Sequence, residues 1–339
     1  MMPTAFHLYV GVDIAAKTFI ATWAADVTSV PRAVTFDQTA AGFERFQQQL
    51  ATTGIAPAAT LVVLEATGSY WIALAVALHQ AHYVVSVLNP AHVALYARSL
   101  PRRGKTDALD AQLLVRFAIE RQPPAWSPPE QVYHELRQRL VVRDSLLVMR
   151  TQASNQRHVV QQWPIQIASA HKALDTVISE LDAQVQSLER EIAQVLADGA
   201  WASSATVLLS MPGLGAVTTA WLLVGTLNFT LASSPEQLSS YAGLTPLAYQ
   251  SGTSVRGRAQ LGHGGNGRLR TALYVATLSA ARYNPTIKVF YQRLRAAGKP
   301  MKVARCAAAR KLLHLAWALV KTKQPYRAPV IAQPAEAAA

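Results

Sequence analysis

The stretch Leu8-Tyr9-Val10-Gly11-Val12-Asp13 is an apolar run that ends on a carboxylate. Such a run is typical of a buried strand, and Thr18–Trp23 could pair with it across a short turn. Ala33–Phe36 is a third short candidate strand. Because helices and strands then alternate, we expect a mixed sheet flanked by helices at the start of the chain.

This alternation continues to about residue 120. Thr60–Leu64 and Tyr83–Val87 are patterned as strands. Helices are expected at Ala40–Ala51, Tyr70–Gln80, Pro90–Ser99 and Thr106–Glu120. The segment Gln122–Glu130 then holds four prolines, which neither helices nor central strands tolerate. A first domain is therefore expected over residues 1–122.

The charge of the chain is unevenly distributed. Of the 339 residues 51% are hydrophobic, so the protein is expected to be globular, and its net charge is +13. Residues 200–339 hold 16 Lys and Arg against 2 Asp and Glu, whereas residues 1–199 have a net charge of −1. This asymmetry indicates that the C-terminal part faces a polyanion such as nucleic acid. A basic surface that serves only solubility is the alternative.

The sequence favours a soluble protein of a reducing compartment. Its single cysteine, Cys306, excludes an internal disulfide framework. No secretory signal is visible, and glycine, proline or charged residues interrupt both apolar stretches that resemble membrane spans. We expect a cytoplasmic, nucleoid-associated protein that has no membrane partner.

The middle of the chain has a heptad pattern. Apolar residues recur at alternating spacings of four and three from Leu174 to Val195, which predicts a coiled coil or helical hairpin within a linker region, 123–200. An ordinary amphipathic helix remains the alternative. Residues 201–327 are patterned as a mostly helical domain with one long loop, Thr245–Gly267, and residues 328–339 as a disordered tail.

Four carboxylates stand where a metal site could form. Asp13 and Glu65 each follow an apolar strand, and Asp107 and Asp110 share one face at the start of a helix. Clustered carboxylates repel one another unless a cation neutralises them. Their oxygen atoms suit Mg²⁺ or Mn²⁺, and such ions can clamp the attacking and leaving oxygens of a phosphodiester. Asp107 could instead serve only to start its helix.

The C-terminal region holds two candidate nucleic-acid segments. Met211-Pro212-Gly213-Leu214-Gly215 opens a helix, where free N–H groups, with Gly213 and Gly215 allowing close approach, could bind phosphate. A turn between two core helices would have the same sequence. The second segment, Tyr249–Ser254, precedes a run of basic residues whose guanidinium groups suit phosphate oxygens: Arg256, Arg258, Arg268 and Arg270.

Three acidic segments and the serine segment together resemble a known family. Val-Gly-Val-Asp-Ile-Ala at 10–15, Glu-Ala-Thr-Gly-Ser-Tyr at 65–70 and Lys-Thr-Asp-Ala-Leu-Asp-Ala at 105–111 are similar to signature segments of insertion-sequence transposases. That family has a RuvC-like N-terminal domain with a DEDD tetrad and a C-terminal serine domain. The resemblance extends from about residue 7 to about residue 325.

The resemblance implies an RNase H-like N-terminal fold with Asp13, Glu65, Asp107 and Asp110 as the catalytic tetrad. It places the serine nucleophile, which would form a covalent link to DNA, at Ser251, with Ser254 as the fallback. Many members have a lysine before the Gly-Asn or Gly-Asp turn, where His263 and Gly264 stand here. The role of that basic position is therefore open.

The resemblance also implies partners. Target and donor DNA would be selected by a noncoding bridge RNA, and a homo-oligomer, dimer or tetramer, would form a composite active centre. The heptad helix would help its assembly. Two other hypotheses fit the residues: a RuvC-like metal-dependent nuclease or junction resolvase with an idle serine, and a non-catalytic nucleic-acid-binding protein. Loss of activity in Ser251→Ala would distinguish the serine recombinase from both of these alternatives.

Overall fold

The structure is a computed structural model that describes residues 6–26, 28, 32–100, 106–247, 250–251, 255–257, 259–262 and 264–328. The chain divides into two compact units, Met1–Pro128 and Pro129–Ala339. Their boundary falls inside the proline-rich segment, where neither a helix nor a strand continues. Each unit has its own hydrophobic core.

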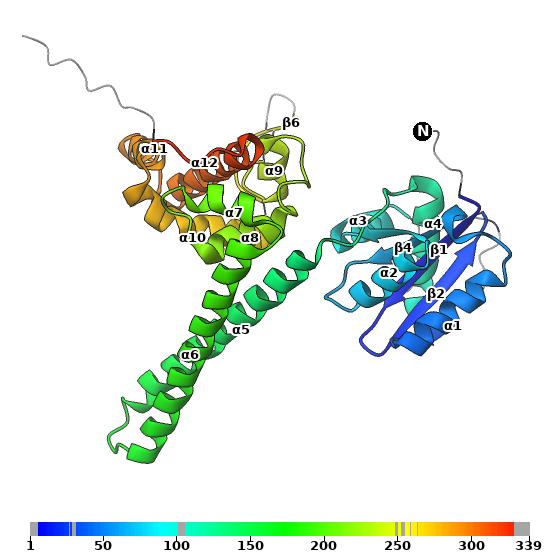
Figure 1. Ribbon diagram of the computed structural model, residues 1–339, viewed down its shortest axis with the longest axis horizontal. Helices are drawn as coiled ribbons and strands as arrows, with labels where there is room; N and C mark the ends of the chain where they lie inside the picture. The colour runs from blue at the N-terminus through cyan, green and yellow to red at the C-terminus, as the bar shows by residue number, and fades with distance from the viewer. Residues whose placement is uncertain are drawn as a thin grey trace, which may run out of the picture. The chain divides into compact units, whose positions relative to one another are not determined.

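Among its described residues, the first unit has a five-stranded sheet in the order β3-β2-β1-β4-β5 (Figure 1). The strands are β1 (Leu8–Ile14), β2 (Thr18–Ala24), β3 (Val34–Asp37), β4 (Thr60–Glu65) and β5 (Val84–Leu88). β1 is antiparallel to β2 and parallel to β4, while β5 is parallel to β4. The expected mixed sheet is thus confirmed, with β1 and β4 near its centre.

Helices cover both faces of this sheet: α1 (Ala40–Ala51), α2 (Trp71–Gln80), α3 (Pro90–Arg98) and α4 (Asp107–Arg121), with a short 3-10 turn, η1 (Pro57–Ala59). Successive side chains of a strand point to opposite faces. Val10 and Val12 of β1 pack with α1 and α2, whereas Tyr9 packs with α3 and α4. The continuous apolar runs in β1 and β4 follow from burial on both faces.

The second unit begins with a long helical hairpin, α5 (Gln131–Val160) and α6 (Ala168–Asp198), which Figure 1 shows side by side. Ion pairs join Arg139 to Glu191, Arg143 to Glu189 and Arg157 to Asp175. Partner numbers fall along α6 as they rise along α5, so the helices are antiparallel. Because partly exposed ion pairs stabilise little, these pairs set the register more than the stability. The helical hairpin expected from the heptads is observed.

The remaining helices form a bundle around the hairpin's end: α7 (Ala202–Leu209), α8 (Ala216–Thr226), α9 (Pro235–Tyr241), α10 (Gly267–Tyr283), α11 (Pro285–Ala296) and α12 (Met301–Thr322). α8 supplies buried residues from Thr219 to Val224, and it contacts α5, α6 and α10. The segment expected to be a long loop instead contains two short strands, β6 (Gln250–Ser251) and β7 (Val255–Arg256). Most of the expected tail, 329–339, lies outside the described residues.

Within the part of the chain that the structure describes, no single helix is long and apolar enough to cross a membrane. The consecutive helices α6 and α7 are together long and apolar enough by length and composition alone, but the chain bends by 111° between them.

Candidate active site

Asp13 and Glu65 lie at the same edge of the sheet. Val12 of β1 is paired in parallel with Leu64 of β4, so the residues that follow them are neighbours at the carboxyl ends of adjacent strands. Both strands are buried up to this point, and both become partly exposed at the carboxylate. The Glu65 side chain accepts a hydrogen bond of 2.9 Å from the Thr67 hydroxyl, which orients it within the turn.

Asp107 and Asp110 occupy the first turn of α4. The Thr106 side chain caps this helix by accepting a hydrogen bond of 3.3 Å from the backbone N–H of Leu109. Carboxylates are favourable at a helix N-terminus, where the backbone N–H groups carry partial positive charge. The first-turn position therefore offsets part of the cost of placing two acidic side chains close to two others.

A glycine allows α4 to lie close to β1. A Cβ atom added at Gly11 would lie 2.2 Å from the carbonyl oxygen of Ala111 and 2.6 Å from the backbone nitrogen of Val115. Both obstacles are backbone atoms of α4, so a side chain could be accommodated only if the helix moved. Gly11 thereby fixes the distance between the strand that carries Asp13 and the helix that carries Asp107 and Asp110.

Three other carboxylates influence the ionisation of Asp13. Burial, followed by the negative charges of Asp107, Asp110 and Glu65 in decreasing order, raises the pKa of Asp13 from 3.8 to about 6. A hydrogen bond with the backbone of Ile14 opposes this shift. Carboxylates from two other chain segments therefore act on the Asp13 carboxyl group, an arrangement that a bound cation would stabilise.

The four carboxylate side chains do not enclose a metal-binding site in this structure. Among the described residues, no three His, Cys, Asp or Glu groups lie close enough together to hold one metal ion. The donor chemistry nevertheless fits a hard divalent cation, because all four groups offer oxygen atoms and their mutual repulsion would be relieved by positive charge. Metal binding would require rotation of these partly exposed side chains toward one another.

The serine segment is described only in part. Ser251 pairs with Val255 across the β6–β7 ribbon, and Leu247 pairs with Gln260 beyond it. The side chains of Ser251 and Arg256 lie outside the described residues, as do Ser254, Arg258 and His263 altogether. Ser251 therefore stands on a hairpin of the second unit, and the nucleophile assignment stays a prediction.

The Pro-Gly turn before α8 packs against α10. Gly213 has a φ of 103°, and a Cβ atom there would lie 2.5 Å from the Cβ of Ala280. The Asn284 side chain donates a hydrogen bond of 3.2 Å to the carbonyl of Pro212. Gly215, by contrast, has open space around its Cα and precedes the first turn of α8. Gly213 thus has a packing role, whereas Gly215 leaves room for a ligand.

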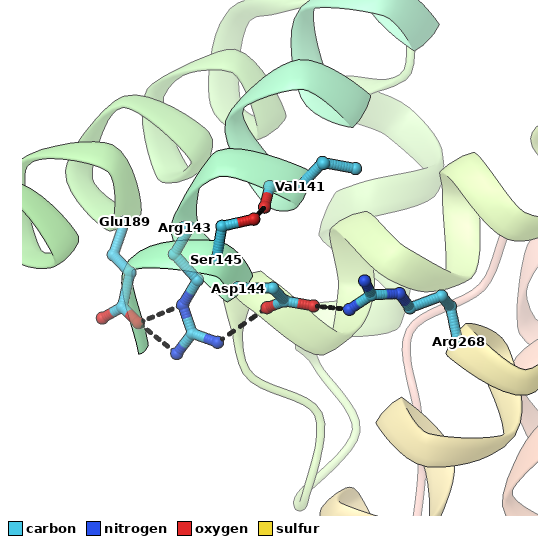
Figure 2. Close-up of polar contacts among 6 residues, drawn as sticks. All are labelled: Val141, Arg143, Asp144, Ser145, Glu189 and Arg268. Atoms are coloured by element: carbon cyan, nitrogen blue, oxygen red, sulfur yellow. Dashed lines mark hydrogen bonds and ion pairs between the residues drawn. The ribbon is translucent and has the colours of Figure 1, made fainter. Parts of the chain in front are cut away.

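Arg268 is held by the helical hairpin (Figure 2). Its guanidinium donates a hydrogen bond of 2.7 Å to Asp144 of α5. It also lies 5.8 Å from the centroid of the Trp221 ring. Asp144 also accepts a bond of 3.2 Å from Arg143, and Arg143 pairs in turn with Glu189 of α6. These side chains form a continuous polar chain from α6 through α5 to the start of α10 (Figure 2).

Arg270 donates a hydrogen bond of 2.9 Å to the carbonyl of Gly264 and one of 3.5 Å to that of Gly243. It shares with Arg143, Asp144 and Arg268 the lining of a pocket of about 770 Å³. Sequence reasoning missed Arg143 and Asp144, because the contact of Asp144 with Arg268 of α10 joins positions more than a hundred residues apart. The heptad pattern marks their helix as amphipathic but does not show which polar residues meet α10.

The comparisons with known proteins bear on the whole chain. A pilin gene-inverting protein of Moraxella bovis is 31% identical over 325 residues, which cover 94% of this chain and 97% of that protein. Residues 205–292 match a family model described as transposase, IS116/IS110/IS902 family. The chain belongs to the IS110 family of transposases. Residues 10–162 match a second model, the DEDD transposase model of IS110, which is described as transposase.

Other relatives of this IS110-family transposase come from insertion elements. An uncharacterised 43.6 kDa protein of the element IS110 from Streptomyces coelicolor is 36% identical over 115 residues, 34% of this chain and 28% of that protein. One of 42 kDa from IS900 of Mycobacterium paratuberculosis is 29% identical over 191 residues. The transposase is therefore an insertion-sequence recombinase, an enzyme that cuts and rejoins DNA.

Proposed function

We propose that this transposase cuts and rejoins DNA with two sets of groups, an acidic metal site and a serine nucleophile. Asp13, Glu65, Asp107 and Asp110 would hold Mg²⁺ or Mn²⁺, and Ser251 would attack the DNA backbone. The observation that carries the proposal is the convergence of the four carboxylates, since three of them raise the pKa of the fourth. The family match over residues 10–162 spans all four.

A divalent ion at this site would neutralise the negative charge that builds up on the phosphate and on the departing oxygen. The protein's part is to hold the ligands in place. The sheet does so by placing Asp13 and Glu65 at the ends of adjacent strands, with Thr67 donating a hydrogen bond to Glu65. The order β3-β2-β1-β4-β5 supports an RNase H-like, RuvC-like assignment for this unit.

The serine step is a transesterification. The Ser251 hydroxyl oxygen would bond to phosphorus while the bond from phosphorus to one deoxyribose oxygen breaks, and the hydroxyl proton would pass to solvent or to that oxygen. Because the serine–DNA link is itself a phosphodiester, a second DNA hydroxyl could attack its phosphorus in the reverse reaction and rejoin the strands. Arg256, Arg258, Arg268 and Arg270 would pair with phosphate oxygens during this exchange.

The substrates would be target and donor DNA, selected by a noncoding bridge RNA. The net charge of +14 over residues 200–339 supports binding of a polyanion, and the family resemblance supports the RNA. A homo-oligomer, dimer or tetramer, would bring one subunit's acidic site to another's serine. The exposed α5–α6 hairpin supports such assembly.

The test is to trap a covalent protein–DNA adduct. The full chain, RNA transcribed from the flanks of its element, labelled DNA and Mg²⁺ would be separated on a denaturing gel. Ser251→Ala and Asp13→Asn should both abolish the adduct, by a factor of at least about 1,000 for the loss of a nucleophile. Ser254→Ala, three residues further along the chain, is the matched control and should retain it.

A native gel shift on the same samples shows whether the RNA–DNA complex has formed. Cleavage that persists in Ser251→Ala without an adduct would overturn the serine mechanism and leave a metal-dependent nuclease. An adduct that disappears only in Ser254→Ala would move the nucleophile by three residues.

A further inference from the structure

A second pocket, apart from the acidic site, lies in the helical unit. It has a volume of about 710 Å³, within the range of roughly 300–1,000 Å³ typical of ligand pockets. One wall is a face of α12, where lining residues recur every three or four positions from Lys302 to His314. The opposite wall comes from Leu244 and Leu261, which flank the ribbon that carries Ser251.

The rim of this pocket is cationic. Lys302, Arg310 and Lys311 line it, and its described lining includes no carboxylate. Glu236 lies close enough to act electrostatically on Arg310 and on the lining residue His314, but it is not part of the lining. The unbalanced positive charge therefore suits an anion, and phosphate is the anion that Arg and Lys side chains bind most readily in nucleic acids.

The pocket also has apolar lining residues. These are Leu244, Leu261, the exposed Val303 and Phe290 of α11, whose ring is partly buried. The ammonium of Lys311 lies 4.7 Å from the centroid of that ring. A cation beside an aromatic and aliphatic surface offers one ligand two contacts, a phosphate contact and a stacking or van der Waals contact with a flat base.

We propose that this pocket takes an unstacked nucleotide of the DNA strand that is cut or exchanged. The base lies against the Phe290 side of the pocket, and the adjoining phosphates lie on Lys302, Arg310 and Lys311. Strand exchange leaves nucleotides unpaired, and the pocket wall is continuous in sequence with the serine ribbon, so DNA is the occupant that fits the enzyme's reaction. The inference rests on DNA recombination by this family and is independent of the role of Ser251.

Cys306 provides the readout, because it lines the pocket and is the single cysteine of the chain. The full protein would be alkylated with iodoacetamide, at mildly alkaline pH because burial raises the pKa of this thiol. Saturating oligo-dT of twelve nucleotides should slow labelling at least about fivefold, because a base seated in the pocket covers the thiol. An abasic deoxyribose-phosphate oligomer of equal charge should slow it less than about twofold.

A variant that fills the pocket gives the matched comparison. Ala307→Leu adds apolar volume inside the pocket without changing charge, whereas Ala318→Leu adds the same volume at an exposed position of the same helix, outside the lining. The first should reduce the preference of the protein for oligo-dT over the abasic oligomer by at least about fivefold, and the second should leave it unchanged.

Equal protection of Cys306 by both oligomers, or none by either, would overturn the proposal even if Ala307→Leu failed to fold. Protection by oligo-U but not by oligo-dT would also overturn it and assign the pocket to RNA. These measurements need neither cleavage nor Mg²⁺. Failure of the serine mechanism would therefore leave their outcome unchanged, and the two proposals fail separately.

Discussion

Asp13 is a carboxylate whose ordinary ionisation is opposed by its surroundings. It is partly buried at the end of β1, and three negative side chains act on it. In the absence of a cation this arrangement destabilises the folded protein near neutral pH. Such a cost is expected where the proposed metal site requires clustered negative charge.

The sign of the pH dependence follows from the two pKa values. The folded pKa, about 6, lies above the value of 3.8 for an unperturbed carboxyl group. Asp13 therefore contributes stability that is full below about pH 3.8 and is lost as the pH rises through about 6. Asp13→Asn should stabilise the protein at pH 8 in EDTA by about 1–2 kcal/mol, a value discounted for partial exposure.

This prediction is checked by thermal unfolding of the full chain at pH 4 and pH 8. The gain should be present at pH 8 and small at pH 4. Asp37→Asn is the control, since Asp37 is exposed and pairs with Arg45 at 3.7 Å, away from the site. An unchanged midpoint in Asp13→Asn at pH 8 would contradict the electrostatic cost assigned to the cluster.

The contact between α4 and β1 is the decisive feature at the scale of the element. α4 carries two of the four carboxylates and β1 carries a third, so their separation sets the geometry of the site. That separation depends on the missing side chain at position 11, because the nearest atoms belong to the backbone of α4. Displacing the backbone of α4 at these atoms would also shift its first turn, which carries Asp107 and Asp110.

Gly11→Ala should therefore destabilise the protein by about 3 kcal/mol and displace Asp107 and Asp110 from Asp13. Urea unfolding measures the first effect, and Mn²⁺ titration by calorimetry measures the second as weaker binding. Gly267→Ala, where the nearest atom to an added Cβ is 3.9 Å away, should change neither. If Gly11→Ala were as stable as the wild type, α4 would not be packed this closely against β1.

The turn before α8 contains two glycines with different expected roles, Gly213 in packing and Gly215 in ligand binding. Gly213→Ala meets both a positive φ of 103° and the Cβ of Ala280, so it should cost about 2–4 kcal/mol of stability. Gly215→Ala meets no atom within 4 Å and should leave stability unchanged to about 0.5 kcal/mol.

The affinity for DNA tests the expected role of Gly215 in ligand binding. If phosphate approaches the start of α8, Gly215→Ala should weaken binding of a DNA duplex severalfold in a filter or fluorescence assay. Equal binding by the wild type and Gly215→Ala would remove this turn from the DNA interface and leave it a core connection.

At the scale of the whole molecule, the charge asymmetry makes residues 200–339 the part expected to meet nucleic acid. Among these basic residues Arg268 has a carboxylate partner on another helix, because Asp144 of α5 pairs with it and the Trp221 ring lies beside it. A guanidinium held in place loses less conformational freedom on binding than a free one.

Affinity for a DNA duplex should fall steeply with salt, because bound phosphates release counterions. Arg268→Gln should lower affinity across all sequences and reduce the slope of log affinity against log salt by about 1. Arg45→Gln, an exposed change in the first unit, should leave the slope unaltered. A slope unchanged in Arg268→Gln would exclude this side chain from phosphate contact.

The sequence by itself determined the elements of the first unit and the chain positions of its carboxylates. Strand runs such as 60–64 and the helix Ala40–Ala51 agree with β4 and α1 to within one residue. Alternation and helical spacing are local patterns that report which face of an element is buried, so they need no knowledge of the partner. They also place Asp13 and Glu65 at strand ends.

Only the tertiary structure decided which faces meet. The clash that Gly11 avoids, the contact of Gly213 with Ala280 and the ion pair between Asp144 and Arg268 all join residues distant in the chain. The pocket along α12 likewise needs α11 and the segment around the serine ribbon to close it. Periodicity specifies that a face is buried, but close packing of distant elements selects the atoms that touch there.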